Sequence, residues 1–438
     1  MKILFLLLLL FLSACTVSDP EERLKAALKH PTTVSELYLF CDGAPPLFMI
    51  RRPMKKLSGE IGQFINLKKL DLSHNELETL PLELAKLKNL EELHLNGNQF
   101  AEISPVIKEL PNLLVLDMTA NTLKELPLDF FKLVRLKKLW LGGNEIASLP
   151  EQIDALVELE YLYLPANRLT SLPIEICHLK KLSSLDVSEN QLTELPECIG
   201  DLSKLKTLHL YANKITRLPT SMANLKKLSW LELNGNAITN LPAWFGNFVN
   251  LVVLNLGANK IETVPAGIGN LTELTTLILG ANRIHDLPIE LSRCNKITEL
   301  NLTKNAFTHI PPAIFALTNL EHLDLSENPI TEASPLISKL GKLRILDLSK
   351  TKLTHLPSEI SRCQNLFSLI LDGTEIAELP SEISELKNLW SLSLERTKIT
   401  QLPPTIKQLS KLRRLYLREI NLSSEQKTKI KKVVTIQL

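Results

Sequence analysis

The chain has 438 residues, of which 45% are hydrophobic and only 5% are aromatic. Its 50 Lys and Arg residues nearly balance its 48 Asp and Glu residues, and the net charge of +2 excludes the broad basic surface of a nucleic-acid-binding protein. The apolar content is sufficient for a large core, and the scarcity of aromatic residues makes the position of each one informative.

The N-terminus has the pattern of a secretory signal peptide. Lys2 precedes an unbroken apolar run at residues 3–12, which is too short to cross a bilayer core of about 30 Å. The run ends in Leu12-Ser13-Ala14-Cys15, which resembles the lipobox of bacterial lipoproteins. The resemblance implies that Cys15 becomes the acylated N-terminus and anchors the protein to a membrane. The alternative is ordinary secretion, in which Cys15 is an incidental thiol.

A short irregular region follows the signal peptide. Residues 20–30 predict a helix with an acidic first turn, and residues 37–39 predict a divergent first strand. We therefore predict a signal peptide at 1–14 and a lipidated N-terminus with a divergent cap at 15–52. A repeat solenoid then occupies 53–420, and a C-terminal cap occupies 421–438.

The solenoid is predicted from a strict 23-residue period. Twelve asparagines mark it, and the same register continues as Thr351, Thr374 and Thr397. A fixed period of this size indicates units that bury their apolar faces only against their neighbours. The amide side chains can bond to backbone groups that each sharp turn exposes to the core, so we predict a structural ladder formed by Asn75, Asn98, Asn121, Asn144, Asn167, Asn190, Asn213, Asn236, Asn259, Asn282, Asn305 and Asn328.

Each repeat predicts one short strand and one short helical segment. The alternation of leucines before each ladder position is typical of a strand with one buried face. The outer segment follows a Leu-Pro step, with Pro at thirteen such positions, and has room for about two turns of α- or 3₁₀-helix. Parallel strands stack about 4.8 Å apart, whereas the outer segments are bulkier, so the stack curves with its sheet inside.

The consensus LxxLxLxxNxLxxLPxxIxxL resembles the leucine-rich repeat family, in its 23-residue form with a Leu-Pro step. The resemblance covers residues from about 33 to 438. Together with the lipobox, it makes the chain similar to a bacterial leucine-rich-repeat lipoprotein. It implies an α/β solenoid, a horseshoe with a concave parallel β-sheet and short helical or 3₁₀ segments on the convex side. It also implies that the concave face binds other macromolecules.

The cysteines beyond Cys15 do not predict a disulfide framework. Cys294 and Cys363 occupy a position that is leucine in other repeats, so we expect both to be small buried hydrophobic residues. Cys177 and Cys198 lie in adjacent turns but two residues out of phase, which is an unfavourable geometry for a bridge.

The concave face is predicted to carry a partner-binding strip. Residues six, four and two positions before each ladder site face outward from the sheet, and aromatic residues gather there in the fourth to eighth strands. Exposed Trp and Tyr are typical of interface hot spots, although cross-strand stacking that only stabilises the sheet is an alternative. The candidate partner-binding residues are Trp140, Tyr161, Tyr163, His209, Tyr211 and Trp230.

Two charged groups are weaker candidates. Arg414, Tyr416 and Arg418 alternate on the concave side of the last regular strand, where they could bind an anion or simply form a solvated cap. Five aspartates share one strand column and could form an acidic site, but solvated strand residues are the more common explanation. They are Asp71, Asp117, Asp186, Asp324 and Asp347.

No motif indicates catalysis, a metal or a cofactor. A P-loop, a GxSxG elbow, an HExxH motif and a paired CxxC motif are all missing from the sequence, and the nine histidines are scattered. The sequence therefore predicts a monomeric, non-catalytic binding scaffold, lipid-anchored in the bacterial cell envelope at the outer membrane, with a protein ligand on the concave face. The alternative is a carbohydrate- or glycolipid-binding envelope component that uses the same aromatic residues as stacking platforms.

Overall fold

The computed structural model describes residues 19–41, 53–422 and 435–437. It divides into two compact units, residues 1–208 and 209–438. The predicted signal peptide and Cys15 lie outside the described residues, as does most of the predicted C-terminal cap. In the part of the chain that is described, no helix is long and apolar enough to cross a membrane.

The first unit begins with the helix predicted near the N-terminus. Asp19 caps helix α2 (Pro20–Ala27) by accepting a hydrogen bond from the backbone N–H of Glu21, as an N-cap carboxylate does. A short 3₁₀ turn, η2 (Pro31–Thr33), then leads to the first strand, β1 (Glu36–Tyr38). This strand lies where the divergent first strand was predicted.

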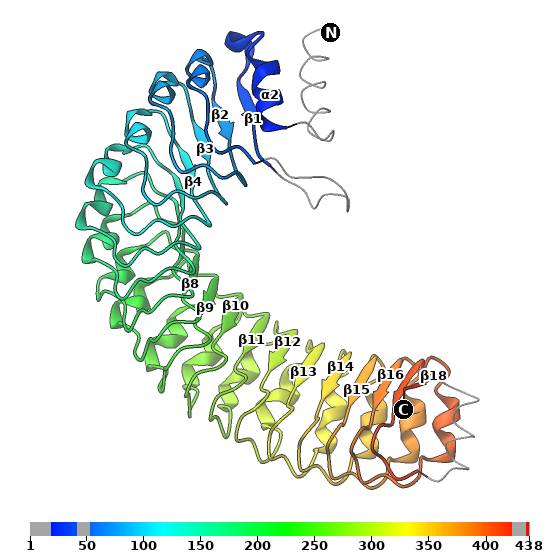
Figure 1. The fold of residues 1–438 in the computed structure, drawn as a ribbon. Coiled ribbons are helices and arrows are strands. Elements are labelled where there is room, and N and C mark those ends of the chain that lie inside the picture. Colours follow the sequence, from blue (N-terminus) through cyan, green and yellow to red (C-terminus); the bar gives the residue numbers. More distant parts are fainter. Residues whose placement is uncertain (1–18, 42–52, 423–434, 438) are drawn as a thin grey trace. The chain divides into compact units, whose positions relative to one another are not determined.

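Regular repeats follow, each with a 3₁₀ segment and a three-residue strand (Figure 1). In the first unit these are η3 (Gly59–Gln63), β2 (Lys69–Asp71), η4 (Leu82–Lys86), β3 (Glu92–His94), η5 (Pro105–Glu109), β4 (Val115–Asp117), η6 (Leu128–Lys132), β5 (Lys138–Trp140), η7 (Glu151–Ala155), β6 (Tyr161–Tyr163), η8 (Ile174–His178), β7 (Ser184–Asp186) and η9 (Ile199–Asp201). Strand β8 (Thr207–His209) lies at the boundary between the units.

The second unit continues the same alternation and ends with one additional strand. Its elements are η10 (Thr220–Asn224), β9 (Trp230–Glu232), η11 (Ala243–Asn247), β10 (Val253–Asn255), η12 (Ala266–Asn270), β11 (Thr276–Ile278), η13 (Ile289–Arg293), β12 (Glu299–Asn301), η14 (Pro312–Ala316), β13 (His322–Asp324), η15 (Pro335–Lys339), β14 (Ile345–Asp347), η16 (Ser358–Arg362), β15 (Ser368–Ile370), η17 (Ser381–Glu385), β16 (Ser391–Ser393), η18 (Pro404–Gln408), β17 (Arg414–Tyr416) and β18 (Thr435–Gln437).

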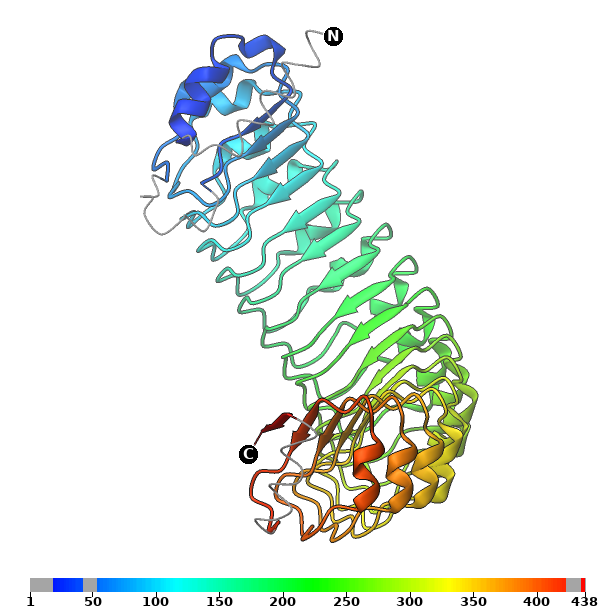
Figure 2. The same ribbon diagram turned by 90° about the vertical axis from the view of Figure 1, so that its right-hand side faces the viewer.

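The strands pair in parallel with their neighbours in sequence. Within the first unit β1 to β7 form one run, and within the second unit β9 to β18 form another (Figure 2). Regular strands pair 23 residues apart, as Leu139 does with Leu162. In each unit the strands line one side and the 3₁₀ segments the other (Figure 1), which confirms the predicted α/β solenoid with a parallel sheet.

The outer segments are 3₁₀-helices throughout the described repeats, because they are too short for sustained α-helical bonding. In the repeat after Asn144, the N–H of Ile153 donates to the carbonyl of Pro150 at 3.1 Å, and the N–H of Leu156 donates to Ile153 at 3.2 Å. Pro150 lies at the N-cap, immediately before the helix. Its fixed φ and missing N–H suit a position where no helical hydrogen bond is required of it.

The core is a continuous stack of mainly aliphatic side chains, with phenylalanines at some positions. In one repeat Ile153, Leu159, Leu162 and Leu164 are all completely buried, and the same positions are buried along both units. The predicted substitution of leucine by cysteine is confirmed, because Cys294 and Cys363 are buried free thiols. Burial raises the pKa of each of these thiols to about 11, which keeps them in the unreactive thiol form.

The ladder asparagines link each turn to the one before it. Asn144 accepts a hydrogen bond at Oδ1 from the N–H of Leu123, 21 residues earlier. Its Nδ2 donates to the carbonyls of Met118 and Leu141, 26 and three residues earlier, each at 2.9 Å. The residue before each ladder position is left-handed, as at Gly143 (φ 63°), so the chain turns sharply there.

The threonines of the C-terminal repeats reproduce only part of this bonding. The hydroxyl of Thr374 donates to the carbonyl of Leu371, three residues earlier, at 2.7 Å. Thr351 and Thr397 do the same with Leu348 and Leu394. A hydroxyl is too short to reach the preceding turn as the amide does, so these repeats keep the local bond and lack the bond to the carbonyl 26 residues earlier.

The prediction that Cys177 and Cys198 do not pair is wrong. They form a disulfide with a Cα–Cα distance of 5.9 Å across 21 residues. The outer segments are offset between turns, so residues 21 apart face each other there. The same spacing joins Lys180 to Asp201 at 3.4 Å. A disulfide between these outer segments therefore joins cysteines 21 residues apart, not 23 residues apart as in the paired strands.

Candidate protein-binding surfaces

The open face of the sheet consists of the side chains that point away from the core, six and four positions before each ladder residue. Strand β6 shows the arrangement, because Tyr161 and Tyr163 are half-buried while Leu162 between them is fully buried. The residues of the open face therefore contribute little to the core. Core packing does not restrict which residue types occupy these positions, so they are available for binding.

An aromatic cluster occupies the open face of the first unit. The rings of Trp140 and Tyr163 lie 6.2 Å apart between centroids, and those of Tyr161 and Tyr163 lie 6.4 Å apart and nearly parallel. The ammonium of Lys138 lies 5.3 Å from the Tyr161 ring and 6.0 Å from the Trp140 ring. Such contacts hold the rings in place, so they form a preorganised apolar surface.

His94 extends this cluster and carries its main electrostatic feature. Its ring stacks on Trp140 at 6.4 Å, and its two nitrogens lie 3.9 Å from the Asp117 carboxylate and 3.5 Å from that of Glu92. The neighbouring Asp117 raises the pKa of His94, while burial opposes the shift and Asp71 and Glu92 support it. His94 therefore keeps its positive charge to a higher pH than an isolated imidazole does.

A second aromatic pair lies on the open face of the second unit. His209 Nδ1 is 2.6 Å from the carboxylate of Glu232, and its ring lies 6.3 Å from that of Trp230. Trp230 is 43% exposed, whereas Tyr211 is half-buried. The structure thus places the predicted strip in two parts, with Trp140, Tyr161 and Tyr163 in the first unit and His209, Tyr211 and Trp230 in the second. Of these, Tyr211 lies two residues after the end of strand β8, outside the two columns of the open face.

Comparison with known proteins gives the repeat its family. Family models described as leucine-rich repeat region, leucine rich repeat and leucine rich repeats (2 copies) match residues 115–281 in overlapping segments, 295–353 and 65–108, respectively. A leucine-rich repeat protein from Leptospira interrogans is 34% identical, with a TM-score of 0.78, over 95% of this chain and 98% of that one. The chain belongs to the leucine-rich repeat family.

Other solved structures share the leucine-rich repeat fold. The plant peptide hormone receptor RGFR1, in complex with RGF2, is 30% identical with a TM-score of 0.69, over 84% of this chain and 65% of that one. An internalin from Listeria monocytogenes is 23% identical with a TM-score of 0.61, over 76% of this chain and 88% of that one, which shows the fold alone. A comparison with curated protein sequences found no match.

The three residues at the C-terminal end of the leucine-rich repeat sheet do not converge on one anion site. The guanidinium of Arg414 lies over the ring of Trp390, 4.5 Å from its centroid. Arg418 lies 3.7 Å from Glu419, whose carboxylate also pairs with Arg396 at 2.9 Å. Tyr416 is half-buried. Arg414 therefore belongs to an aromatic stack, and Arg418 is already close to a carboxylate.

The aspartate column has a structural role in the leucine-rich repeats. The carboxylates of Asp71, Asp186 and Asp324 each accept a hydrogen bond from the N–H two residues later, at 2.9–3.0 Å. Asp117 and Asp347 make the same contact. They thereby stabilise the chain as it leaves each strand. Among the described residues, no group of three or more acidic, His or Cys side chains could hold a metal ion.

Sequence reasoning missed a second column of functional interest, seven positions before the ladder. There the rings of Phe367 and Trp390 stack 5.2 Å apart with an interplanar angle of 7°, and Phe367 is 41% exposed. The prediction considered only residues six, four and two positions before the ladder. The signal was available, because these two aromatic residues are 23 positions apart in the sequence.

Proposed function

We propose that this leucine-rich repeat protein is a lipid-anchored component of the bacterial cell envelope, held at the outer membrane, that binds a protein partner through the open face of its sheet. The repeat family supports a binding scaffold, and the family is generally non-catalytic. The plant receptor RGFR1 in complex with RGF2 supports a peptide or protein as the class of ligand. The proposed anchor rests on the sequence Leu12-Ser13-Ala14-Cys15.

The observation that carries the proposal is the cluster of Trp140, Tyr161, Tyr163 and Lys138. Large aromatic side chains with few rotatable bonds provide contact area at low entropic cost. Their mutual contacts of 6.2 and 6.4 Å restrict them before binding, which reduces the cost of ordering them in a complex. Such residues have the composition of an interface hot spot.

Partner capture tests the binding function. The immobilised full-length protein is exposed to bacterial and host extracts, and the bound protein is then titrated against variants. We expect Trp140→Ala to weaken binding by about 1 kcal/mol or more, with only a small fall in melting temperature from the lost ring contacts. Leu128→Ala is the matched control, because Leu128 is a large apolar residue that is 64% exposed in η6, away from the open face. Equal affinity of the wild type and Trp140→Ala would place the site elsewhere, and retention on glycans alone would favour the carbohydrate-binding alternative.

Acylation is tested separately. The variant Cys15→Ser is expected to lose palmitate labelling and to leave the membrane fraction, because no acceptor thiol remains at the lipobox. Full labelling of this variant would refute the anchor without affecting the binding proposal.

A further inference from the structure

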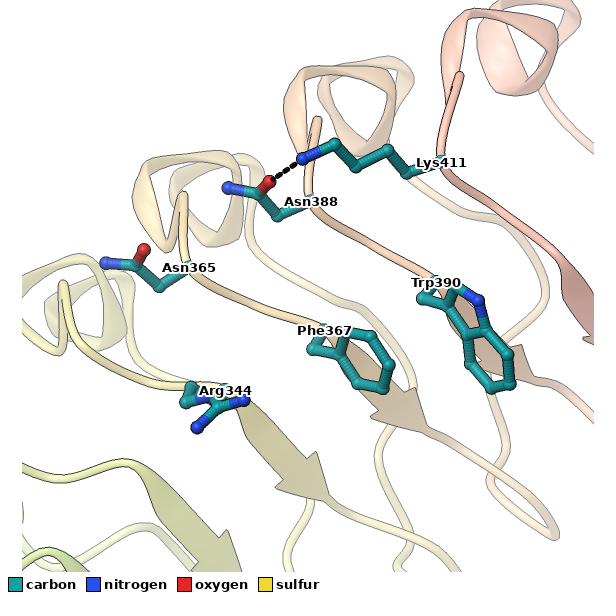
Figure 3. A pocket seen from close by; sticks show the side chains of 6 residues that line it. All are labelled: Arg344, Asn365, Phe367, Asn388, Trp390 and Lys411. Carbon is teal, nitrogen blue, oxygen red and sulfur yellow. Dashed lines mark hydrogen bonds between the residues drawn. The ribbon is translucent and has the colours of Figure 1, made fainter.

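A trough of about 320 Å³ lies in the second unit, where the chain enters successive strands (Figure 3). Two rows of side chains line it. Arg344, Phe367 and Trp390 form one row, seven positions before the ladder, and Asn365, Asn388 and Lys411 form the other, nine positions before it. The six residues come from consecutive repeats, so the trough follows the stacking direction of the strands.

The amide row is fixed by bonds to the backbone. Asn365 Nδ2 donates to the carbonyl of Gly341, and Asn388 Nδ2 donates to that of Gln364, both at 2.8 Å. Lys411 Nζ donates to Asn388 Oδ1 at 2.7 Å (Figure 3). The row therefore presents an ammonium group and amide oxygens in a defined order.

The aromatic row is a stack in which Trp390 is enclosed on both sides. Phe367, from the preceding repeat, stacks on Trp390 at 5.2 Å, and the Arg414 guanidinium, from the following repeat, lies 4.5 Å from the Trp390 centroid. Because these neighbours come from opposite sides, both faces of the indole are covered. The edge of an aromatic ring carries partial positive charge, so the accessible edge of Trp390 favours electronegative atoms.

The charges that line the trough are positive. Arg344 and Lys411 line it and no acidic residue does. Arg344 lies 3.7 Å from Glu321, which occupies the same column one repeat earlier, and the two side chains are 59% and 41% exposed, so this pair is weak. The lining is thus complementary to an anionic ligand.

An equivalent trough in the first unit provides an internal comparison. It has about 300 Å³ and is lined at the same two columns by Lys68, Asn89, Glu91, Asn112, Leu114 and Arg135. Its wall contains the ion pair of Lys68 and Glu91 at 2.9 Å and no aromatic ring. The repeat backbone therefore forms the trough in both units, whereas the aromatic and uniformly cationic lining is a property of the second unit's sequence.

We propose that the trough of the second unit binds an extended acidic peptide segment of a protein partner. Carboxylates of such a segment would pair with Arg344 and Lys411, and a peptide N–H would donate to the Asn365 amide oxygen. The lining comes from four consecutive repeats. Their strands are about 4.8 Å apart, so Arg344 and Lys411 are separated by about 14 Å along the stack, which matches about four residues of extended chain. A saccharide would stack on an exposed ring face, and neither face of Trp390, the larger of the two rings, is open to it. This site is separate from the open face and does not depend on the proposed function.

The test measures fluorescence anisotropy of a fluorescein-labelled hexaglutamate peptide with the full-length protein. We expect saturable binding that Lys411→Glu weakens at least tenfold and Phe367→Leu weakens about threefold. Arg135→Glu is the matched control, because it occupies the same column of the other trough and changes the net charge equally. We expect it to leave the affinity unchanged, with circular dichroism spectra identical for all variants.

Three outcomes would overturn the inference. The absence of hexaglutamate binding to the wild type would remove the site. Equal weakening by Lys411→Glu and Arg135→Glu would show attraction to the whole chain rather than to this trough. Tighter binding of hexagalacturonate than of hexaglutamate, with the same loss in Lys411→Glu, would identify a saccharide site instead.

Discussion

Replacing Asn144 by alanine tests how the ladder stabilises the fold. The substitution removes the acceptor for the buried N–H of Leu123, at 2.9 Å, and the donors to the carbonyls of Met118 and Leu141. The two carbonyls retain one bond each, from Asn121 at 3.0 Å and from the next ladder residue at 2.9 Å. Only the N–H of Leu123 therefore loses its sole ladder partner.

The expected cost follows from this count. A buried donor left without a partner costs about 1–3 kcal/mol, and the weakened carbonyls add to it, so we expect Asn144→Ala to lower the free energy of unfolding by about 2 kcal/mol or slightly more. Asn144→Thr should cost nearly as much, because the hydroxyl of Thr351 bonds only to the carbonyl three residues earlier, a bond that the neighbouring ladder residue already provides at Leu141.

The matched control is Asn89→Ala, which removes the same side chain from an exposed position. Asn89 Nδ2 makes one hydrogen bond, to the carbonyl of Ile65 at 3.0 Å, and its loss should change stability by no more than about 0.5 kcal/mol. Urea unfolding followed by circular dichroism measures the midpoints, and hydrogen exchange with mass spectrometry reports on the amide of Leu123. Equal midpoints for Asn144→Ala and Asn89→Ala, with unchanged exchange at Leu123, would refute the ladder argument.

Three further predictions concern the cysteines and the open face. Cys177→Ser, which removes the bridge to Cys198, should lower the free energy of unfolding by about 3 kcal/mol, because the crosslink joins residues 21 apart and restricts that loop in the unfolded chain. An unchanged urea midpoint would contradict this. The thiol of Cys294, whose pKa is raised to about 11 by burial, should resist iodoacetamide in native protein at pH 8 and react only after unfolding, as mass spectrometry can show. Asp117→Asn should lower the pKa of His94, measured by NMR titration of the imidazole. In the wild type, the stabilisation from protonated His94 is complete below its unfolded pKa of about 6.5 and is lost as pH rises through the higher folded value; an unshifted titration would show that Asp117 is not the cause.

The strand positions could be read from the sequence because each depends on a local pattern repeated in register. The leucines that alternate before Asn167 and the Leu-Pro step at Pro150 determine one turn. The adjacent repeats carry the same pattern 23 residues away, which supports the same assignment. The last strand, β18 at Thr435–Gln437, pairs with β17 but lies after the 23-residue period has ended. The sequence showed only a short apolar segment there and gave no register for a strand.

The sequence predicts which strand positions face outward on the candidate surfaces, but it does not predict which side chains contact each other there. Sequence spacing placed Tyr161 and Tyr163 on one face, yet the tilt that brings His94 over Trp140 at 6.4 Å depends on side-chain packing across two repeats. The stack of Phe367 and Trp390 lies seven positions before the ladder, outside the three columns that the strand alternation assigns to the open face. The bridge between Cys177 and Cys198 was missed because the outer segments follow a different offset from the strands.

The ladder also constrains how such a chain can change in length. Each amide reaches backbone groups 21 and 26 residues earlier, so a single inserted residue within one turn separates a donor from its acceptor in the next. Addition or removal of a complete 23-residue unit leaves every such distance in sequence intact. The hydrogen-bond column thereby makes the whole repeat the smallest change in length that the solenoid tolerates, and it accounts for a register that continues from Asn75 to Asn328 without one inserted or deleted residue.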